Sequence, residues 1–207
     1  MPDDIKQGAA PMTIKANESI IEKQYHETMD TVISECMKAL EAIDPKMTEA
    51  ILEMLSKADK IFFIGVGRVM LSLKAIAKRF SHIGFNTYCV GSITEPAITN
   101  RDVLIVGSGS GESLIPVAIA KKAKTHGAKV ILIGSNPQST IAGLSDLFVR
   151  IPVCTKMQLP EEIQSSQPMT SLFEQSLLLY GDILASMIIQ QKGINIQALW
   201  KRHANLE

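Results

Sequence analysis

Five short apolar runs, separated by segments with helical spacing, constrain the fold of this chain more than any other feature of its sequence. The runs cover residues 61–64, 87–90, 103–106, 130–133 and 147–151. None of them alternates apolar with polar side chains, which indicates strands buried on both faces of a parallel sheet. Four of the five are followed directly by glycine, and each is expected to lead into a helix. The pattern therefore predicts a doubly wound, three-layer α/β/α sandwich with a five-stranded parallel sheet, whose ligand binds at the carboxyl ends of the strands.

Two helices are predicted before the sheet. In residues 17–43, apolar side chains recur at spacings of three and four, which is typical of an amphipathic helix. Pro45 is expected to begin a second, shorter helix. Residues 1–16 are predicted to be a flexible N-terminus, and residues 17–207 to form a single domain.

A long aperiodic connection, residues 152–167, follows the last predicted strand and contains two prolines. Connections of this length in compact domains are often functional. A helix is expected from about Pro168 to Gly193. Its buried stripe is predicted to consist of Phe173, Leu177, Tyr180, Leu184 and Ile188.

Composition excludes several functional classes. The chain has 207 residues, of which 46% are hydrophobic, and its 21 basic residues balance its 21 acidic ones, so no charge footprint favours nucleic acid or an anionic membrane. No uninterrupted apolar run approaches about 18 residues, and the start lacks the pattern of a signal peptide, so we expect a cytoplasmic protein. Cys36, Cys89 and Cys154 are odd in number and widely spaced, which argues against disulfides or a metal site and predicts reduced, partly buried thiols.

A loop of small residues, Gly107-Ser108-Gly109-Ser110-Gly111-Glu112-Ser113, separates the third apolar run from the helical segment 114–123. Glycines allow the backbone to approach an anion closely, helix amides favour its charge, and the three serine hydroxyls can donate hydrogen bonds. A tight strand-to-helix turn without a ligand is the alternative. The interleaved serines favour a phosphate site.

Nucleotide sites are disfavoured by what these loops lack. No Lys-Ser or Lys-Thr follows the serine loop, so it is not the phosphate loop of an NTPase. The first turn contains Gly65 and Gly67, but Met70 stands where a dinucleotide fingerprint has its third glycine. The two turns, with Arg68, predict a site for a single phosphomonoester on a small metabolite.

These motifs together resemble the sugar-isomerase (SIS) phosphosugar-binding domain. The likeness rests on residues 65–68, the serine loop and residues 137–139. The segments 167–169, 171–175 and 202–207 are similar to the 6-phospho-3-hexuloisomerase family. The resemblance implies the SIS fold with strands in the flavodoxin-like order. It also implies interconversion of D-arabino-hex-3-ulose 6-phosphate and D-fructose 6-phosphate in the ribulose monophosphate pathway, without a cofactor or a metal. A homo-oligomer, a tetramer built as a dimer of dimers with sites at subunit interfaces, is expected with it.

Moving a carbonyl from C3 to C2 through an enediolate requires a base for the C2 proton and a group that protonates the oxygens. The resemblance assigns the base to Glu174, whose helical neighbours Leu177 and Leu178 are expected to place its carboxylate beside apolar surface. A solvated helix glutamate is the alternative. His82 and His203 compete for the role of the acid.

Other predicted substrate contacts each have a plain structural alternative. Arg68 is expected to pair with the substrate or with Glu112, and its alternative is a surface cation at a helix start. Glu112 is expected to contact the substrate, and its alternative is a first-turn acid that complements the amides of the helix that follows it. Thr94 offers a hydroxyl to the sugar or lies in a simple turn. The chain departs from the family pattern at Val69-Met70, where Ser-Gly is common, and at Thr170, where a glycine is common. These departures leave the identity of the sugar open.

Two other functions remain in view. SIS domains also occur in regulators, so a non-catalytic phosphosugar sensor is one alternative. The absence of a recognisable helix-turn-helix segment and the presence of Glu174 count against it. An SIS isomerase acting on another sugar phosphate is the second alternative.

Overall fold

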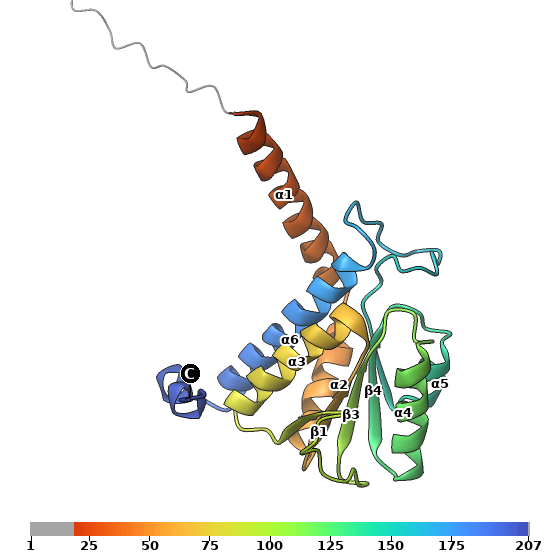
Figure 1. Ribbon diagram of the computed structural model, residues 1–207, viewed down its shortest axis with the longest axis vertical. Helices are drawn as coiled ribbons and strands as arrows, with labels where there is room; N and C mark the ends of the chain where they lie inside the picture. Colours follow the sequence, from red (N-terminus) through yellow and green to blue (C-terminus); the bar gives the residue numbers. More distant parts are fainter. Residues whose placement is uncertain (1–18, 207) are drawn as a thin grey trace, which may run out of the picture.

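The computed structural model describes residues 19–206, and within them the five predicted strands form one parallel sheet (Figure 1). The sheet order is β2-β1-β3-β4-β5, with every neighbouring pair parallel, as the flavodoxin-like expectation requires. The chain adds β2 on one side of β1 and then crosses to add β3, β4 and β5 on the other side, so the strand order reverses between β1 and β3. The strands are β1 (Ile61–Ile64), β2 (Thr87–Cys89), β3 (Val103–Gly107), β4 (Lys129–Gly134) and β5 (Leu147–Arg150).

Helices cover both faces of the sheet, which confirms the predicted three layers. Ile61 and Phe63 of β1 pack with one set of helices, whereas Phe62 and Ile64 pack with the other, because successive side chains of a strand point to opposite faces. The first face carries α2 (Pro45–Ser56), α3 (Gly67–His82) and α6 (Ser171–Gln191). The second carries α4 (Leu114–Thr125) and α5 (Thr140–Leu144).

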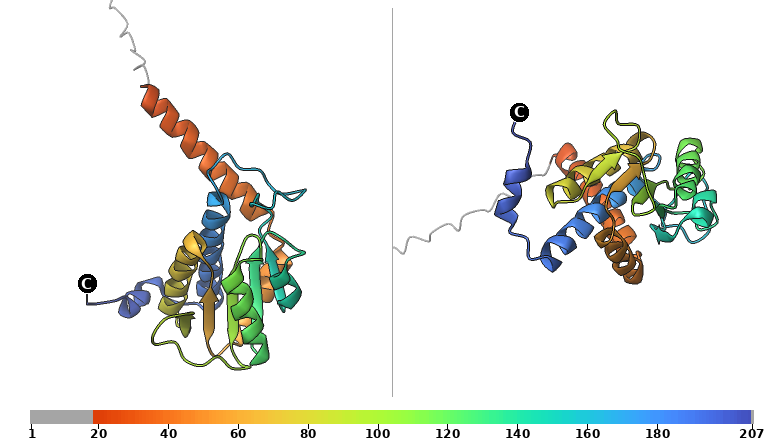
Figure 2. Two further views of the ribbon diagram at one scale, coloured as in Figure 1. Left: turned by 45° about the vertical axis from the view of Figure 1, so that its right-hand side comes forward. Right: turned by 90° about the horizontal axis from the view of Figure 1, so that it is seen from below.

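Helix α1 (Ile20–Glu41) stands out from the body of the molecule (Figures 1 and 2). A capping box begins it: the amide of Glu22 donates to the hydroxyl of Ser19 at 3.0 Å, and the Glu22 carboxylate accepts from the Ser19 amide. Only its C-terminal part contributes to the core, through Cys36 and Ala39. The amphipathic helix is therefore confirmed, while the predicted flexible segment 1–16 lies outside the described residues.

Two local predictions are wrong. No helix follows β2: residues 90–102 form turns and irregular chain, in which Gly91 has a φ of +90° and Pro96 disfavours helical geometry in the residue before it. The last long helix begins at Ser171 rather than near Pro168. Met169 has a φ of +58°, which interrupts any helical path across this turn.

Helix α6 is the central helix of the first face. By length and composition alone it could cross a membrane, but here it packs against α1, α2 and α3 as a core helix. It runs beside α3, and both helices begin at the carboxyl edge of the sheet (Figure 1). The predicted stripe is confirmed as buried: Phe173, Leu177, Tyr180, Leu184 and Ile188. A 3-10 helix, η1 (Ile196–Arg202), follows it in the tail, and all three cysteines are free thiols that are buried or half-buried.

Gly181 allows α6 to approach α3 closely. A Cβ atom at this position would lie 2.3 Å from Cγ1 of the buried Ile76. We expect Gly181→Ala to lower the free energy of unfolding by about 1–3 kcal/mol, because overpacking outweighs the gain in helix propensity. Gly143→Ala in α5 is the matched control, since a Cβ there meets nothing within 4 Å and should stabilise by up to about 1 kcal/mol. Urea unfolding at one protein concentration compares the two, and equal effects would contradict this account of the helix contact.

Candidate active site

A cavity of about 280 Å³ opens at the carboxyl ends of β1 and β3, where the strand order reverses. Such a switch point is where doubly wound sheets bind their ligands. The cavity brings together predicted site residues from both turns and from α6. They are Gly67, Arg68, Ser108, Gly109, Ser110, Ser113 and Glu174.

Three helices present uncapped N-termini to this cavity. Their N-cap residues are Val66 of α3, Ser113 of α4 and Thr170 of α6, and none caps its helix through its side chain. All three residues line the cavity. The other described helices are capped by their N-cap side chains: Ser19, Asp44, Ser139 and Asn195. Open amides and three positive helix ends around one cavity favour an anionic ligand.

The serine loop is held in a shape that leaves hydroxyl groups available. The hydroxyl oxygens of Ser108 and Ser110 accept hydrogen bonds from the amides of Gly111 and Glu112, at 3.1 and 3.3 Å, so their hydrogens can still be donated to a ligand. Gly111 has a φ of +65°, and a Cβ there would lie 2.1 Å from the Ser139 hydroxyl. Gly111 therefore shapes the loop and does not line the cavity.

Glu174 is buried, and its carboxylate is paired on both oxygens. Oε2 accepts a hydrogen bond from Nε of Arg68 and forms an ion pair with it. Oε1 accepts a hydrogen bond from the hydroxyl of Thr170 at 2.9 Å. The side chain is not a solvated helix glutamate: its carboxylate has Arg68 and Thr170 as polar partners, and the predicted neighbour Leu178 lines the same surface pocket as Glu174. Arg68 lies in the first turn of α3, where the helix end disfavours a cation, and the carboxylate offsets this.

Arg68 does not pair with Glu112, which corrects the second predicted contact. The exposed Glu112 accepts from the amide and hydroxyl of Thr140 at 2.6 and 2.8 Å, and these bonds lower the pKa of its carboxyl. It thus caps α5 and not its own following helix. Gly65 and Thr94 also fall outside the cavity: a Cβ on Gly65 would lie 3.0 Å from Leu73, and Thr94 is exposed in the loop after β2.

Neither predicted histidine lies at this cavity. His82 ends α3, about 21 Å along the helix from Arg68. Its ring centroid is 5.6 Å from that of His203 in the tail, which in turn lies 5.5 Å from Trp200. Burial lowers the pKa of His82, and the nearby Lys78 and Arg79 lower it further. Within residues 19–206, its Nε2 is buried without a hydrogen-bond partner.

Sequence reasoning missed several residues that line the cavity: Val66, Val69, Thr155, Lys156, Thr170 and Phe173. Thr155 and Lys156 belong to the connection 152–167, whose length and prolines were the available signal. The buried Glu162 holds this connection in place, since its carboxylate accepts from the Ser135 hydroxyl at 2.8 Å and from the Leu159 amide at 2.9 Å. Phe173 was assigned to the core stripe alone, yet its ring also forms part of the cavity wall.

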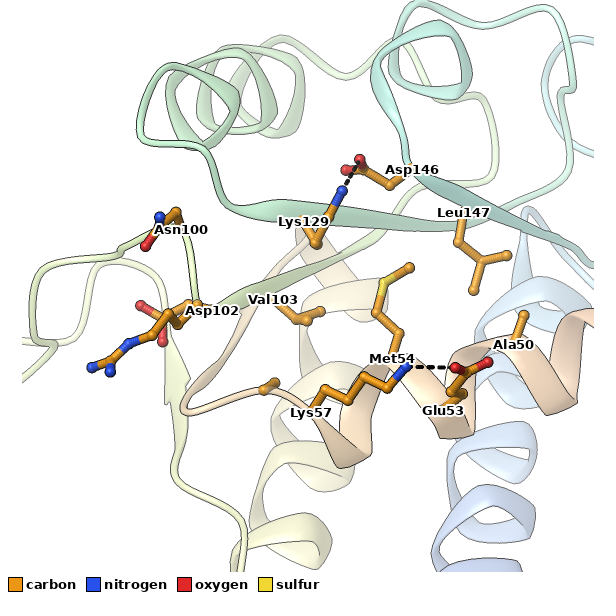
Figure 3. Close-up of a pocket in the computed structure, with 12 residues that line it drawn as sticks. Ala50, Glu53, Met54, Lys57, Asn100, Asp102, Val103, Lys129, Asp146 and Leu147 are labelled. Carbon is orange, nitrogen blue, oxygen red and sulfur yellow. Dashed lines mark hydrogen bonds and ion pairs between the residues drawn. The ribbon is translucent and has the colours of Figure 1, made fainter.

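A larger cavity, of about 450 Å³, lies between α2 and the amino ends of β3, β4 and β5 (Figure 3). Its cations are already paired: Lys57 with Glu53, and Lys129 with Asp146 at 3.2 Å. Arg101 pairs with Asp59 at 2.9 Å. Because no charge is left for a ligand, we assign the site to the smaller cavity. In the described part of the chain, no three histidine, cysteine or acidic side chains gather to hold a metal ion.

Helix α1 is tied to the segment that leads into α6. The Glu35 carboxylate accepts hydrogen bonds from the hydroxyl of Ser165 at 2.6 Å, the amide of Ser166 at 2.9 Å and the side-chain amide of Gln167 at 3.0 Å. Partial burial alone raises the pKa of Glu35, but these hydrogen bonds outweigh it and lower the pKa from 4.5 to about 2.

Comparisons with known proteins by sequence profile, by sequence and by structure agree on one family. The sequence profile of the SIS domain matches residues 54–184. A 3-hexulose-6-phosphate isomerase of Bacillus subtilis is 34% identical, across 87% of this chain and 98% of that protein. The enzyme of the same name from Mycobacterium gastri is 35% identical, across 80% and 82%. A solved structure from Methanococcus jannaschii, reported to infer a molecular function of 3-hexulose-6-phosphate isomerase, has a TM-score of 0.75 at 29% identity, across 87% and 99%.

The contacts of Glu35 predict a pH dependence of stability. Its pKa is lower in the folded chain, so the stabilisation is fully present above about pH 4.5 and is lost as the pH falls toward about 2. We expect this loss to be about 1–2 kcal/mol after solvent screening, and Glu35→Gln to remove it. Glu41→Gln, at the exposed end of the same helix, is the control. Urea unfolding between pH 2 and 7 measures the difference, and parallel curves for wild type and Glu35→Gln would contradict the prediction.

Proposed function

The chain belongs to the SIS domain family, and from this premise we propose that it is an isomerase that interconverts D-arabino-hex-3-ulose 6-phosphate and D-fructose 6-phosphate. The observation that carries the proposal is one cavity with two chemically different ends. The serine hydroxyls and the open N-terminus of α4 lie at one end, and the carboxylate of Glu174, in the first turn of α6 and beside Arg68 of α3, lies at the other. The relatives named as isomerases favour an enzyme over the sensor alternative.

The serine loop would hold the phosphate. Ser108, Ser110 and Ser113 offer hydroxyls, and the first turn of α4 offers amides and a positive helix end. Lys156 adds a cation that has no acidic partner in the described chain. Since Arg68 is already paired with Glu174, Lys156 is the cation that can balance a dianion. An anchored phosphate fixes the sugar relative to the base.

Glu174 would act as the base on the sugar. The proton on C2 passes to its carboxylate, the C3 carbonyl oxygen takes up negative charge, and an enediolate with a double bond between C2 and C3 results. The proton on the C2 oxygen then passes to the C3 oxygen, and Glu174 returns its proton to C3, which leaves the carbonyl at C2 and a hydroxyl at C3, so atoms and charge balance. The guanidinium of Arg68, beside the carboxylate, is placed to stabilise the oxyanion. This is the reaction of the ribulose monophosphate pathway that the family resemblance implies.

A second copy of the chain would pack on α1. An apolar row along this helix recurs every fourth residue, and each member is between 39% and 73% exposed. Rows with this spacing interdigitate when two helices cross, and two copies of the same row are self-complementary. The row consists of Ile21, Tyr25, Met29, Ile33 and Met37.

The histidine pair would then serve the site of a neighbouring copy. His82 and His203 lie together at the end of α3 away from their own cavity. His203 is the exposed member of the pair and can meet a substrate, whereas His82 is buried behind it. A histidine from another copy would supply the acid that the cavity of one chain lacks.

The role of the base is tested by Glu174→Gln. We expect kcat on 3-hexulose 6-phosphate to fall by about 10²–10⁴-fold, while inorganic phosphate still binds, because the serine loop is unchanged. Asp182→Asn, an exposed carboxylate on the same helix, is the control and should keep full activity. Formation of fructose 6-phosphate measures turnover, and calorimetry measures phosphate binding. A wild-type protein that binds phosphate but never isomerises the sugar would overturn the proposed function.

The shared site is tested by mixing two inactive variants. Glu174→Gln and His203→Gln are each expected to be inactive as pure proteins. Coexpression should restore roughly a quarter of wild-type activity in a dimer, because half of the assemblies are hybrids and each hybrid has one intact site. If the mixture is no more active than its components, the histidine does not act on a neighbouring site.

A further inference from the structure

The hydroxyl of Thr170 lies one helical turn before Glu174 and donates to its Oε1 at 2.9 Å. We propose that Thr170 is a positioning residue, which fixes the orientation of the base. The inference rests on the proposed function of Glu174 as the base. It concerns a position that the chain does not share with the common family pattern.

Thr170 does not behave as an ordinary helix cap. A threonine at an N-cap usually accepts a hydrogen bond from an amide in the first turn, which satisfies one of the open donors. Thr170 makes no such bond, and its backbone, with φ −109° and ψ 26°, lies outside the extended conformation of the other N-caps. The left-handed Met169 before it turns the chain sharply at this point. The helix end stays open, and the hydroxyl is directed at the carboxylate.

The two oxygens of Glu174 have partners of different mobility. Arg68, on Oε2, has a side chain that is 66% exposed, so it can move to a bound substrate. Thr170, on Oε1, is half-buried and is joined to Glu174 by one turn of the same helix, so it stays in place. We therefore assign proton abstraction to Oε2, and Oε1 to the fixed hydrogen bond that aims it.

Replacing the Thr170 hydroxyl leaves the other polar groups at the cavity in place. Two charged groups line it from other elements: Arg68 from α3 and Lys156 from the connection 152–167. Neither belongs to the turn that carries Thr170. A fall in kcat without a change in KM would therefore report the lost hydroxyl itself.

The experiment compares Thr170→Val, which keeps the shape but lacks the hydroxyl, with Thr170→Ser, which keeps the hydroxyl. For Thr170→Val we expect kcat about tenfold lower and KM within about twofold, because the base is aimed less well while the groups that bind the substrate are unchanged. Thr170→Ser should stay within about twofold of wild type in both kcat and KM. Equal kcat values for wild type and Thr170→Val would overturn the proposal.

A second measurement does not depend on turnover. The side-chain carboxyl carbon of Glu174, assigned by its absence in Glu174→Gln, is observed by NMR at one neutral pH in the same variants. Loss of the hydrogen bond should change its chemical shift in Thr170→Val, and Thr170→Ser should keep the wild-type chemical shift. An unchanged chemical shift in Thr170→Val sinks the role of Thr170. Absence of isomerase activity in wild type, with a changed chemical shift in Thr170→Val, sinks the proposed function instead.

Discussion

Close packing of α3 on α6 is the contact on which the site depends. Both helices begin at the carboxyl edge of the parallel sheet, so their separation sets the distance between Arg68 on one and Glu174 on the other. Gly181 makes that separation small, because Ile76 occupies the space where any other residue would place a Cβ. The third helix at the cavity, α4, is positioned independently from the opposite face of the sheet. The proposed phosphate anchor and the proposed base thus come from different layers and meet only where the sheet order reverses.

The fold could be predicted well because its signals are local. Apolar runs without alternation predicted buried parallel strands, and the serine loop predicted the edge of the sheet at which the candidate cavity lies. The errors arose where geometry depends on a single dihedral or a distant partner. The positive φ of Met169 moved the start of α6, and the irregular chain after β2 gave no period to read. The Glu112 carboxylate accepts a hydrogen bond from the amide of Thr140 at the start of α5, and spacing along the chain does not reveal this contact.

Individual residues of the candidate site were predicted better than the contacts between them. Glu174 and Arg68 were both singled out, but their ion pair joins residues 106 positions apart. Thr170 was noted only as a departure from the family pattern, whereas its hydroxyl contacts the carboxylate directly. The two histidines were alternatives for a single acid role, and their rings lie side by side at the far end of α3, away from the cavity. Lys156 was missed because a lysine in an aperiodic connection carries no positional signal of its own.

Helix α1 connects the proposed interface with a second copy to the segment that leads into α6. It carries the exposed apolar row, and through Glu35 it also holds residues 165–167, only a few positions before Thr170 and Glu174. A rigid helix transmits a displacement along its whole length. A neighbour seated on the row would therefore restrain the entrance of α6 as well as the outside of the molecule, and a protomer without a neighbour would hold its base less firmly. The position of α1 would then affect both assembly and proton transfer.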